Sequence, residues 1–281
     1  MITRRHFLQT AAAATAGSAL FTHSAPTFAK KVKTVGIQLY TVRNELQKDF
    51  VGTLKAVAAA GYKEFEFFGN YYGKDPKEVK TLLAGMGVTA PAGHFALASL
   101  KQDINKVIDT AKAVGHNIVI CPFLMPNERK SLDDYKDLCA VLNRSAEACK
   151  AAGLTFGYHN HDFEFKELGG QLPYDLMLKE CDKNLVKMEL DLGWITHAGK
   201  DPLAYFAKYP GRFITFHVKD MDASQKQITM ELGRGKVDFK RILAQSKQAG
   251  VKHYFVEQDN STIGPLESIK VSMEYLKKLE F

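Results

Sequence analysis

Residues 131–161 read SLDDYKDLCAVLNRSAEACKAAGLTFGYHNH, and this stretch indicates the fold of the whole chain. Residues 131–152 have the apolar spacing of an amphipathic helix. Gly153 follows them, as expected where a helix stops in a left-handed residue. Residues 154–161 are a short run of apolar and aromatic side chains, typical of a buried strand. Helices that alternate with strands in this way predict a parallel sheet.

The same unit of strand, polar loop and helix occurs eight times along the chain. We predict strands at 33–40, 62–68, 88–95, 117–123, 154–161, 186–192, 213–219 and 253–259. We predict helices near 46–60, 76–86, 101–114, 131–152, 171–182, 201–208, 237–249 and 265–279. Eight units in about 250 residues favour an α/β fold of the closed (β/α)8 type, a TIM barrel, over an open sheet. No linker divides the chain, so we predict a single domain.

Other features narrow the class further. The residues after the first strand, 40–44, read YTVRN, whereas a dinucleotide-binding fold has a glycine-rich loop there. Without Arg4 and Arg5 the formal net charge falls from +7 to +5 over 252 residues, with acids mixed throughout. That charge is too small and too evenly spread for a nucleic-acid partner.

Residues 1–29 differ from the rest because they hold no acidic side chain and only two basic ones, Arg4 and Arg5. Paired arginines, a mildly apolar run and small residues near its end are typical of a bacterial twin-arginine export signal. The alternative is a tail with a chance pair of arginines. The apolar run is too short to predict stable membrane insertion. We therefore predict an export signal at 1–29, a barrel domain at 30–281 and a periplasmic protein.

The four cysteines are Cys121, Cys139, Cys149 and Cys181. They have no CxxC spacing. Cys139 and Cys149 would lie about 15 Å apart on one helix, too far for a disulfide. We expect all four to be small core residues.

Four consecutive predicted strands end in side chains that bind metals. The fifth strand ends in His159 and His161, and the next three carry Asp191, His217 and Glu257. In this fold the chemistry lies at the carboxyl ends of the strands, so these side chains should meet. Imidazole and carboxylate ligands suit one divalent ion such as Mn, Zn, Co or Fe. The four strand ends therefore predict a metal site, without deciding between His159 and His161; the alternative is a group of structural polar residues.

Further polar residues belong to the same strands. Because side chains alternate along a strand, Lys219 shares a face with His217, and Glu189 with Asp191. Lys219 is a candidate acid or base if burial beside a cation lowers its pKa. His94 and Glu66 are either substrate contacts or polar residues of a barrel layer. The candidate substrate contacts are His161, His94, Glu66, Gln38, Trp194 and Glu189.

Two other groups of residues remain. The glycine-rich segment 231–235 (ELGRG) is either a connector or a lid over the barrel mouth. His116, His197 and His253 are expected at the surface or at strand starts.

From residue 30 onward the chain resembles the sugar phosphate isomerase/epimerase branch of the xylose isomerase-like barrel superfamily. The segments that carry the resemblance are 36–40 (GIQLY), 159–164 (HNHDFE), 189–194 (ELDLGW), 217–220 (HVKD), 231–235 (ELGRG) and 256–259 (VEQD). In that superfamily Glu, Asp, His and Glu of the last four strands typically hold one divalent metal. The resemblance implies Asp191, His217 and Glu257 as three of them. It aligns His159 with the first glutamate, and leaves open whether His159, His161 or neither is a ligand.

The resemblance also implies a reaction. The epimerase branch moves a proton with two glutamates, which correspond here to Glu257 and, approximately, to Glu164. The implied chemistry is proton abstraction next to a sugar carbonyl, with a metal stabilising the enediolate. Return of the proton elsewhere gives an isomerase or epimerase. Expulsion of a β-substituent gives a dehydratase or lyase.

A periplasmic address does not suit a phosphorylated sugar, so we expect an unphosphorylated sugar, a keto-sugar or a 3-keto-glycoside as substrate. A homo-oligomer is compatible with this barrel class. The main alternative is a catalytically inactive periplasmic sugar-binding barrel. A second is an abasic-site endonuclease, which would need more metal ligands and a basic groove for DNA.

Overall fold

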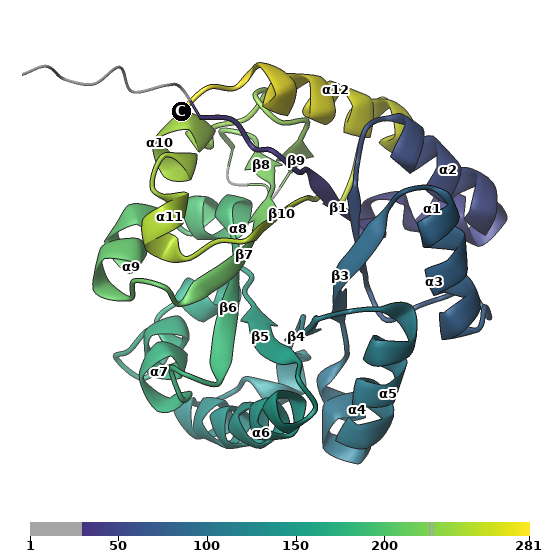
Figure 1. Ribbon diagram of the computed structural model, residues 1–281. Coiled ribbons are helices and arrows are strands. Elements are labelled where there is room, and N and C mark those ends of the chain that lie inside the picture. Colours follow the sequence, from purple (N-terminus) through teal and green to yellow (C-terminus); the bar gives the residue numbers. More distant parts are fainter. Residues whose placement is uncertain (1–29, 225, 227) are drawn as a thin grey trace, which may run out of the picture.

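The computed structural model describes residues 30–281 except 225 and 227, so the expected export signal lies outside the described residues. Eight parallel strands close into a barrel in the order β1-β10-β7-β6-β5-β4-β3-β2 (Figure 1). They are β1 (Gly36–Gln38), β2 (Glu64–Phe67), β3 (Thr89–His94), β4 (Ile118–Cys121), β5 (Thr155–His159), β6 (Val186–Asp191), β7 (Phe213–Val218) and β10 (His253–Val256). Each lies within one predicted strand, so the predicted TIM barrel is confirmed.

Helices surround the barrel on its outer side (Figure 1). They are α1 (Arg43–Lys48), α2 (Phe50–Ala59), α3 (Pro76–Gly85), α4 (Leu97–Gln102), α5 (Ile104–Val114), α6 (Leu132–Ala151), α7 (Pro173–Glu180), α8 (Leu192–His197), α9 (Pro202–Lys208), α10 (Phe239–Leu243), α11 (Ser246–Ala249) and α12 (Pro265–Lys278). Short 3-10 helices are η1 (Leu39–Val42), η2 (Pro126–Glu128) and η3 (Phe163–Phe165).

Three predicted helices are each divided in two. The predicted helices 46–60 and 101–114 are interrupted at Asp49 and Asp103, which have extended φ angles of −147° and −159°. Each aspartate side chain accepts the backbone N–H three residues later, at 2.9 and 3.0 Å. An aspartate in this position stabilises the start of a new helix, so the capping bond competes with continuation of the old one. The predicted helix 237–249 is likewise α10 and α11.

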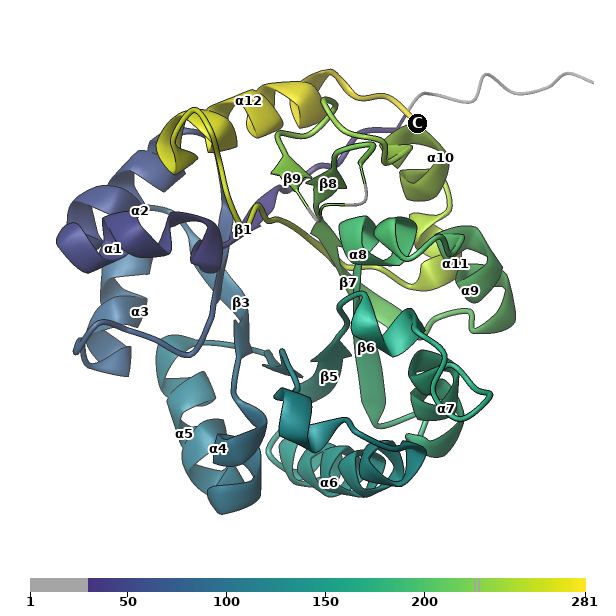
Figure 2. The ribbon, with the colours of Figure 1, turned by 180° about the vertical axis from the view of Figure 1, so that it is seen from behind.

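Helix α8 and the two strands β8 and β9 had no counterpart in the prediction. Helix α8 begins directly after β6, where we had continued the strand to residue 192. Strands β8 (Asp220–Met221) and β9 (Thr229–Met230) form a separate antiparallel pair after β7. Both views of the ribbon show α8, β8 and β9 inside the ring formed by α9, α10 and α12 (Figures 1 and 2). They follow the carboxyl ends of β6 and β7, where the candidate site lies.

The apolar core has two parts. A large cluster packs between the strands and the surrounding helices. A second, smaller cluster consists only of strand residues: Ala92, Ile118, Ile120, Ile214 and Phe255. They come from β3 and β4 on one side of the barrel and from β7 and β10 on the other. Contacts between them pass through the interior, so the barrel is filled by side chains, as expected for this fold.

The cysteines and His116 are also internal. All four cysteines are buried and free, which confirms their prediction as core residues. His116 stands just before β4 and is only 1% exposed, so of the two expected positions it occupies the strand start and not the surface. Its Nδ1 lies 2.7 Å from the carbonyl oxygen of Ala90, and its Nε2 lies 3.0 Å from the hydroxyl of Tyr71. A neutral ring satisfies both bonds, by donating at Nδ1 and accepting at Nε2.

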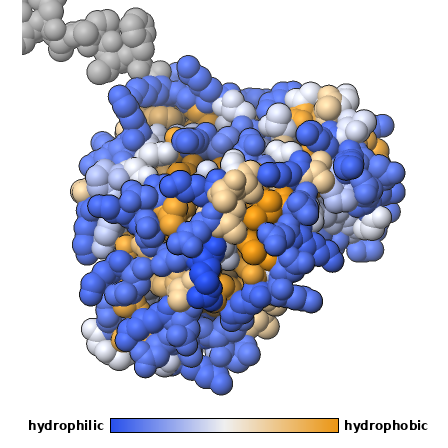
Figure 3. All heavy atoms as spheres, turned by 60° about the horizontal axis from the view of Figure 1, so that its bottom comes forward, coloured by the Kyte–Doolittle hydropathy of each residue, from blue (hydrophilic) through white to orange (hydrophobic). Residues whose placement is uncertain are grey.

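The surface is largely polar. Figure 3 shows one face on which hydrophilic side chains predominate and apolar ones lie in narrow strips between them. The ends of the described chain pair with each other, because Lys30 and Phe281 exchange two backbone hydrogen bonds of 2.8 and 3.0 Å. Among the described residues, no helix combines the length and apolar character needed to cross a membrane.

Candidate metal and sugar site

A cavity of about 380 Å³ opens at the carboxyl ends of the strands. Its lining residues are Tyr40, Phe68, His94, Pro122, Phe123, His159, His161, Glu257 and Asp259. They end or follow β1, β2, β3, β4, β5 and β10. The cavity therefore combines aromatic walls with imidazole and carboxylate groups, in the position where this fold places active sites.

Four predicted metal ligands converge beside this cavity, and we call them the outer cluster: His159, Asp191, His217 and Glu257. One ligand atom of each lies within 4.8 Å of the others, and all four side chains are buried. His217 Nδ1 lies 2.8 Å from Glu257 Oε2 and 3.9 Å from Asp191 Oδ2. Side chains at the carboxyl ends of four strands therefore lie together, as expected from the rule that strand ends meet in this fold (the strand-end rule).

The local structure fixes Asp191 in this cluster. Asp191 ends β6, pairs in register with His217 of β7 and caps the first turn of α8. Its Oδ1 accepts the backbone N–H of Trp194 at 2.8 Å, whereas its Oδ2 has no hydrogen-bond partner. Burial raises the pKa of Asp191 to about 6, although the nearby Lys219 and His217 lower it. Oδ2 instead forms an ion pair with the Lys219 ammonium at 3.1 Å and lies 3.9 Å from His217 Nδ1, so it faces the other members of the cluster.

Lys219 supplies a positive charge beside the outer cluster. Its Nζ lies 2.8 Å from Glu257, 3.1 Å from Asp191 and 3.0 Å from Asp259. Burial alone would lower the pKa of Lys219, but these three carboxylates raise it well above its usual value. The lowered pKa that we had considered is therefore wrong. Lys219 is an ammonium group, so it can donate a proton but is a poor base.

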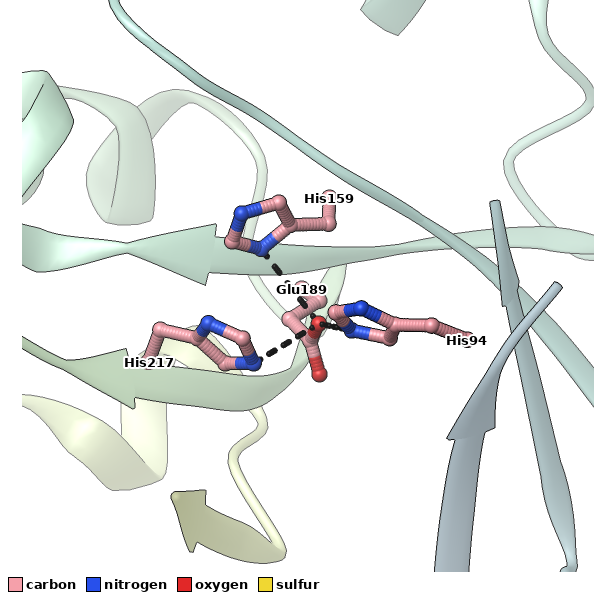
Figure 4. Close-up of side chains that lie close together, drawn as sticks. All are labelled: His94, His159, Glu189 and His217. Carbon is pink, nitrogen blue, oxygen red and sulfur yellow. Dashed lines mark hydrogen bonds and ion pairs between the residues drawn. The ribbon is translucent and has the colours of Figure 1, made fainter. Parts of the chain in front are cut away.

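A second group of side chains, which we call the inner cluster, consists of His94, His159, Glu189 and His217. Glu189 Oε1 lies 2.7 Å from His94 Nε2, 3.0 Å from His217 Nε2 and 3.3 Å from His159 Nδ1 (Figure 4). Glu189 precedes Asp191 by two positions on β6, and it pairs in register with His159. The two clusters share two histidines.

Glu66 and Gln38 surround the inner cluster. Glu66 Oε2 lies 2.6 Å from His217 Nε2 and accepts a hydrogen bond of 2.9 Å from Gln38 Nε2. Gln38, Glu66 and Glu189 are fully buried. The resemblance implies a glutamate at residue 159, where this chain has a histidine. Glu66 and Glu189 supply carboxylates close to that histidine. These three candidate substrate contacts lie in a polar layer of the barrel, and they are not among the residues that line the cavity.

The three histidines of the inner cluster differ in their pKa. Burial opposes protonation of His94, but Glu66 and Glu189 outweigh it and raise the pKa to about 9. Glu189, Glu257 and Glu66 likewise raise the pKa of His217 well above its usual value. Burial and the neighbouring His217 lower the pKa of His159 to about 3, so His159 is neutral. A neutral imidazole is the form that binds metals.

The outer cluster fits a divalent ion. Its donors are two imidazoles and two carboxylates, the set expected for zinc or a similar metal. Asp191 Oδ2 is buried, and apart from its ion pairs with Lys219 at 3.1 Å and His217 at 3.9 Å it has no partner, so it can also serve as a ligand. Carboxylates and imidazoles at these distances need only small movements to surround one ion.

Glu164, the approximate match to a catalytic glutamate, is not brought to the cavity. It is fully buried, its Oε1 accepts a hydrogen bond from the Tyr158 hydroxyl at 2.6 Å, and its Oε2 accepts the His161 N–H at 2.8 Å. Burial raises the pKa of Glu164 to about 7. In this position Glu164 holds the segment after β5 in place.

The remaining candidates lie around the cavity. His161 lines it and stacks on Phe163 with ring centroids 5.5 Å apart. Trp194 lies beside the ammonium of Lys219, which is 4.9 Å from its ring centroid. His94 lines the cavity and also belongs to the inner cluster, so it is placed both to contact a substrate and to form part of the polar layer of the barrel.

The sequence analysis did not select five lining residues: Tyr40, Phe68, Pro122, Phe123 and Asp259. Each is the last or second-last residue of a predicted strand, so the same strand-end rule would have found them. We had applied the rule mainly to polar side chains.

The segment 231–235 is held as a connector. The Asp220 side chain accepts backbone N–H groups of Gly233, Gly235 and Val237 at 2.9, 3.0 and 3.1 Å. Glu231 is only 3% exposed and lies 3.4 Å from Gln258 Nε2. These bonds favour the connector over the lid.

Comparison with known families gives two matches. Residues 54–279 match the sequence model of the family described as xylose isomerase-like TIM barrel. Residues 1–21 match the model of the twin-arginine translocation pathway signal sequence, so the chain carries a signal for that export pathway.

Individual proteins are similar over most of the chain. An inosose dehydratase of Clostridium tetani (strain Massachusetts / E88) is 22% identical over 271 residues, which cover 83% of this chain and 90% of that protein. A sugar phosphate isomerase/epimerase structure from Parabacteroides distasonis ATCC 8503 has a TM-score of 0.75 at 26% identity, covering 89% of this chain and 95% of that one. A structure of the IolI protein with a binding zinc atom has a TM-score of 0.70 at 13% identity, covering 87% and 96%, and shares the fold.

Proposed function

The chain belongs to the xylose isomerase-like TIM barrel family, and from this premise we propose that it is a divalent-metal-dependent carbohydrate enzyme. It abstracts a proton next to the carbonyl group of a sugar, as an isomerase, an epimerase, a dehydratase or a lyase does. The observation that carries the proposal is the outer cluster, with four ligand-type side chains next to the ammonium of Lys219 at the cavity. The similar proteins named as dehydratases and isomerase/epimerases support the same reaction class.

We assign His159, Asp191, His217 and Glu257 as the residues that hold the ion. A divalent ion in this position supplies a Lewis acid for a carbonyl oxygen. The zinc named for the similarly folded IolI protein supports this cofactor class, while the choice among Mn, Zn, Co and Fe stays open.

Two side chains handle the proton. Glu257 lines the cavity, and Lys219 and His217 lower its pKa well below the usual value despite its burial. It is therefore ionised and can accept a proton from a sugar carbon. Lys219, whose ammonium lies 2.8 Å from Glu257 Oε2, is protonated and stabilises negative charge that develops on the sugar oxygens. It can also donate the proton that a leaving group or a second carbon needs.

The position of Glu164 favours elimination over two-base epimerisation. Epimerisation between neighbouring carbons needs a second group that carries protons on the opposite face, and Glu164 is turned away to Tyr158 and His161. Elimination needs one base and one acid, which Glu257 and Lys219 provide. The similarity to inosose dehydratases along 83% of the chain agrees with this direction.

The cavity suits an unphosphorylated sugar, keto-sugar or 3-keto-glycoside. The nine residues that line it, all of them described, include neither lysine nor arginine, which usually bind phosphate. Tyr40, Phe68 and Phe123 offer aromatic faces for the apolar side of a sugar ring. His161 and His94 offer polar contacts beside them. The twin-arginine match supports a periplasmic protein whose barrel domain spans 30–281.

Exchange of carbon-bound hydrogen tests the proposal. The protein, loaded with Zn²⁺ or Mn²⁺, is incubated in D₂O with a 3-keto-glucoside and with an inosose, and NMR follows deuterium at the carbon next to the carbonyl and loss of a β-substituent. Asp191→Asn should lower both by more than about 100-fold, because it removes a ligand without changing shape. Asp133→Asn, on the exposed surface of α6, is the matched control.

The outcomes separate the candidate functions. Exchange or elimination that depends on Asp191 supports the enzyme. Saturable binding of sugars with no exchange at any metal loading would instead indicate the inactive sugar-binding barrel. Salt-sensitive binding of DNA would point to the endonuclease.

A further inference from the structure

The inner cluster has the chemistry of a metal site in its own right, separate from the ligand set assigned above. Its ligand atoms are three imidazole nitrogens and one carboxylate oxygen, all within 4.8 Å of one another. The three rings converge on Glu189 Oε1 from β3, β5 and β7 (Figure 4). Their distances of 2.7 to 3.3 Å from this oxygen approach the roughly 3.3 Å between ligand atoms around a tetrahedral zinc ion.

Two buried polar atoms at this cluster lack partners. His159 Nδ1 and Glu66 Oε1 have no hydrogen-bond partner among the described residues. His159 is 2% exposed and Glu66 is 0% exposed, so neither atom is compensated by water at the surface. His159 Nδ1 is 3.3 Å from Glu189 Oε1 without making a hydrogen bond to it. This is the arrangement expected when a cation belongs between two lone pairs.

The charges around the two clusters also differ. Lys219 already forms ion pairs with Asp191 and Glu257 of the outer cluster. In the described part of the chain, the ion pairs of Glu66 and Glu189 involve histidines alone. No ammonium or guanidinium group therefore competes with a cation in the inner cluster.

We propose that, in the sugar-free protein, a divalent ion that prefers nitrogen ligands binds in the inner cluster, ligated by His94, His159, Glu189 and His217. His217 presents Nε2 to the inner cluster and Nδ1 to the outer one, and His159 also belongs to both. Two ions at once would require both ring nitrogens of each shared histidine to bind metal, so one ion fills one position at a time. The proposed reaction needs the ion at the outer cluster, within reach of a carbonyl oxygen. The ion occupies the inner position in the protein before sugar binds.

The number of coordinated nitrogens distinguishes the two positions. The metal-free protein is loaded with one equivalent of Cu²⁺ without sugar, and pulsed EPR counts the imidazole nitrogens on the ion. The inner cluster predicts three and the outer cluster predicts two. The wild-type count alone decides the question, so a variant that fails to fold does not obscure it.

Three variants give independent support, each measured for Zn²⁺ affinity, Cu²⁺ nitrogen count and thermal unfolding. His94→Gln should lower the count from three to two and weaken Zn²⁺ binding by more than about 100-fold, beyond the usual effect of residues that merely orient ligands. Asp191→Asn should keep the count of three. His116→Gln, which changes a buried histidine outside the cavity and both clusters, is the matched control and should keep both values.

A wild-type count of two would overturn the inner position, and His94→Gln would then leave the count unchanged while Asp191→Asn would lose the ion. That result would leave the proposed reaction intact, because the ion would then lie at the outer cluster. Failure of hydrogen exchange with a count of three would have the opposite meaning: the inner site would stand and the proposed reaction would fail.

Discussion

The ammonium of Lys219 lies 2.8 Å from Oε2 of Glu257, which lines the cavity, and both side chains are buried. The same ammonium also pairs with Asp191 and Asp259. One cation therefore balances three carboxylates from β6 and from the segment after β10. The two carboxylates of the outer cluster are therefore partly neutralised by the ammonium of Lys219.

Replacement of Lys219 should destabilise the protein strongly. In Lys219→Met the three carboxylates lose their common counter-ion, and breaking a buried pair in this way costs about 3–5 kcal/mol. Urea unfolding with both CD and tryptophan fluorescence measures the loss. Added Zn²⁺ should restore part of the stability in Lys219→Met, because a divalent ion replaces the missing charge.

The control for this change is Lys270→Met. Lys270 pairs with Glu267 on the exposed surface of α12, and such pairs contribute about 0–1 kcal/mol. If Lys219→Met were as stable as Lys270→Met, the carboxylates would have another source of compensation and the picture of a single shared cation would be wrong.

Gly193 should be sensitive to the smallest substitution. A Cβ at this position would lie 2.8 Å from Lys219 Cγ and 2.9 Å from the carbonyl oxygen of Lys219. The backbone atom cannot move aside cheaply, so Gly193→Ala should displace α8 or Lys219 at a cost of about 1–3 kcal/mol. Metal affinity should fall as well, because Asp191 caps the start of α8.

Gly85→Ala is the comparison for this variant. Gly85 ends α3, and a Cβ there meets no heavy atom within 4 Å. Alanine should stabilise this helix by about 0.5–1 kcal/mol. Equal melting temperatures of the two variants would show that the close approach of Lys219 to Gly193 does not prevent a larger side chain there.

The fold could be predicted from the sequence because its evidence is local and repeated. Each strand is a short apolar run and each helix an amphipathic one, and the eight repeats leave few alternatives. The breaks at Asp49 and Asp103 were missed because one capping hydrogen bond outweighed a helical pattern that continued past it. Helix α8 was missed because its first residues continue the apolar run of β6.

The site could be predicted in part for the same reason. Strand ends bring His159, Asp191, His217 and Glu257 together whatever the details of packing. The direction of Glu164 depends on a hydrogen bond to Tyr158 that spacing does not reveal. The pKa of Lys219 depends on how many carboxylates surround it, and Asp259 was not counted among them at first.

Glu164 and Glu257 should respond differently to the same substitution. Glu257→Gln removes the ionised carboxylate at the cavity and should lower hydrogen exchange by about 100-fold or more, the usual range for a general base. Glu164→Gln keeps the shape of a buried residue outside the cavity and should lower exchange by less than about tenfold. NMR in D₂O measures both. Equal losses would restore Glu164 as a second base.

Acid should destabilise the protein through His116. Burial lowers the pKa of His116 to about 4, although its bond to the Ala90 carbonyl opposes the shift. The unfolded chain takes up a proton near pH 6.5, whereas the folded protein resists it until about pH 4. His116 therefore contributes full stability above pH 6.5, and this contribution is lost as the pH falls from 6.5 to 4, by about 3 kcal/mol in total. Urea unfolding at several pH values in this window should show a shallower loss in His116→Gln than in the wild type. Parallel losses would mean that the ring is protonated in the folded protein, which its bond from the Tyr71 hydroxyl opposes.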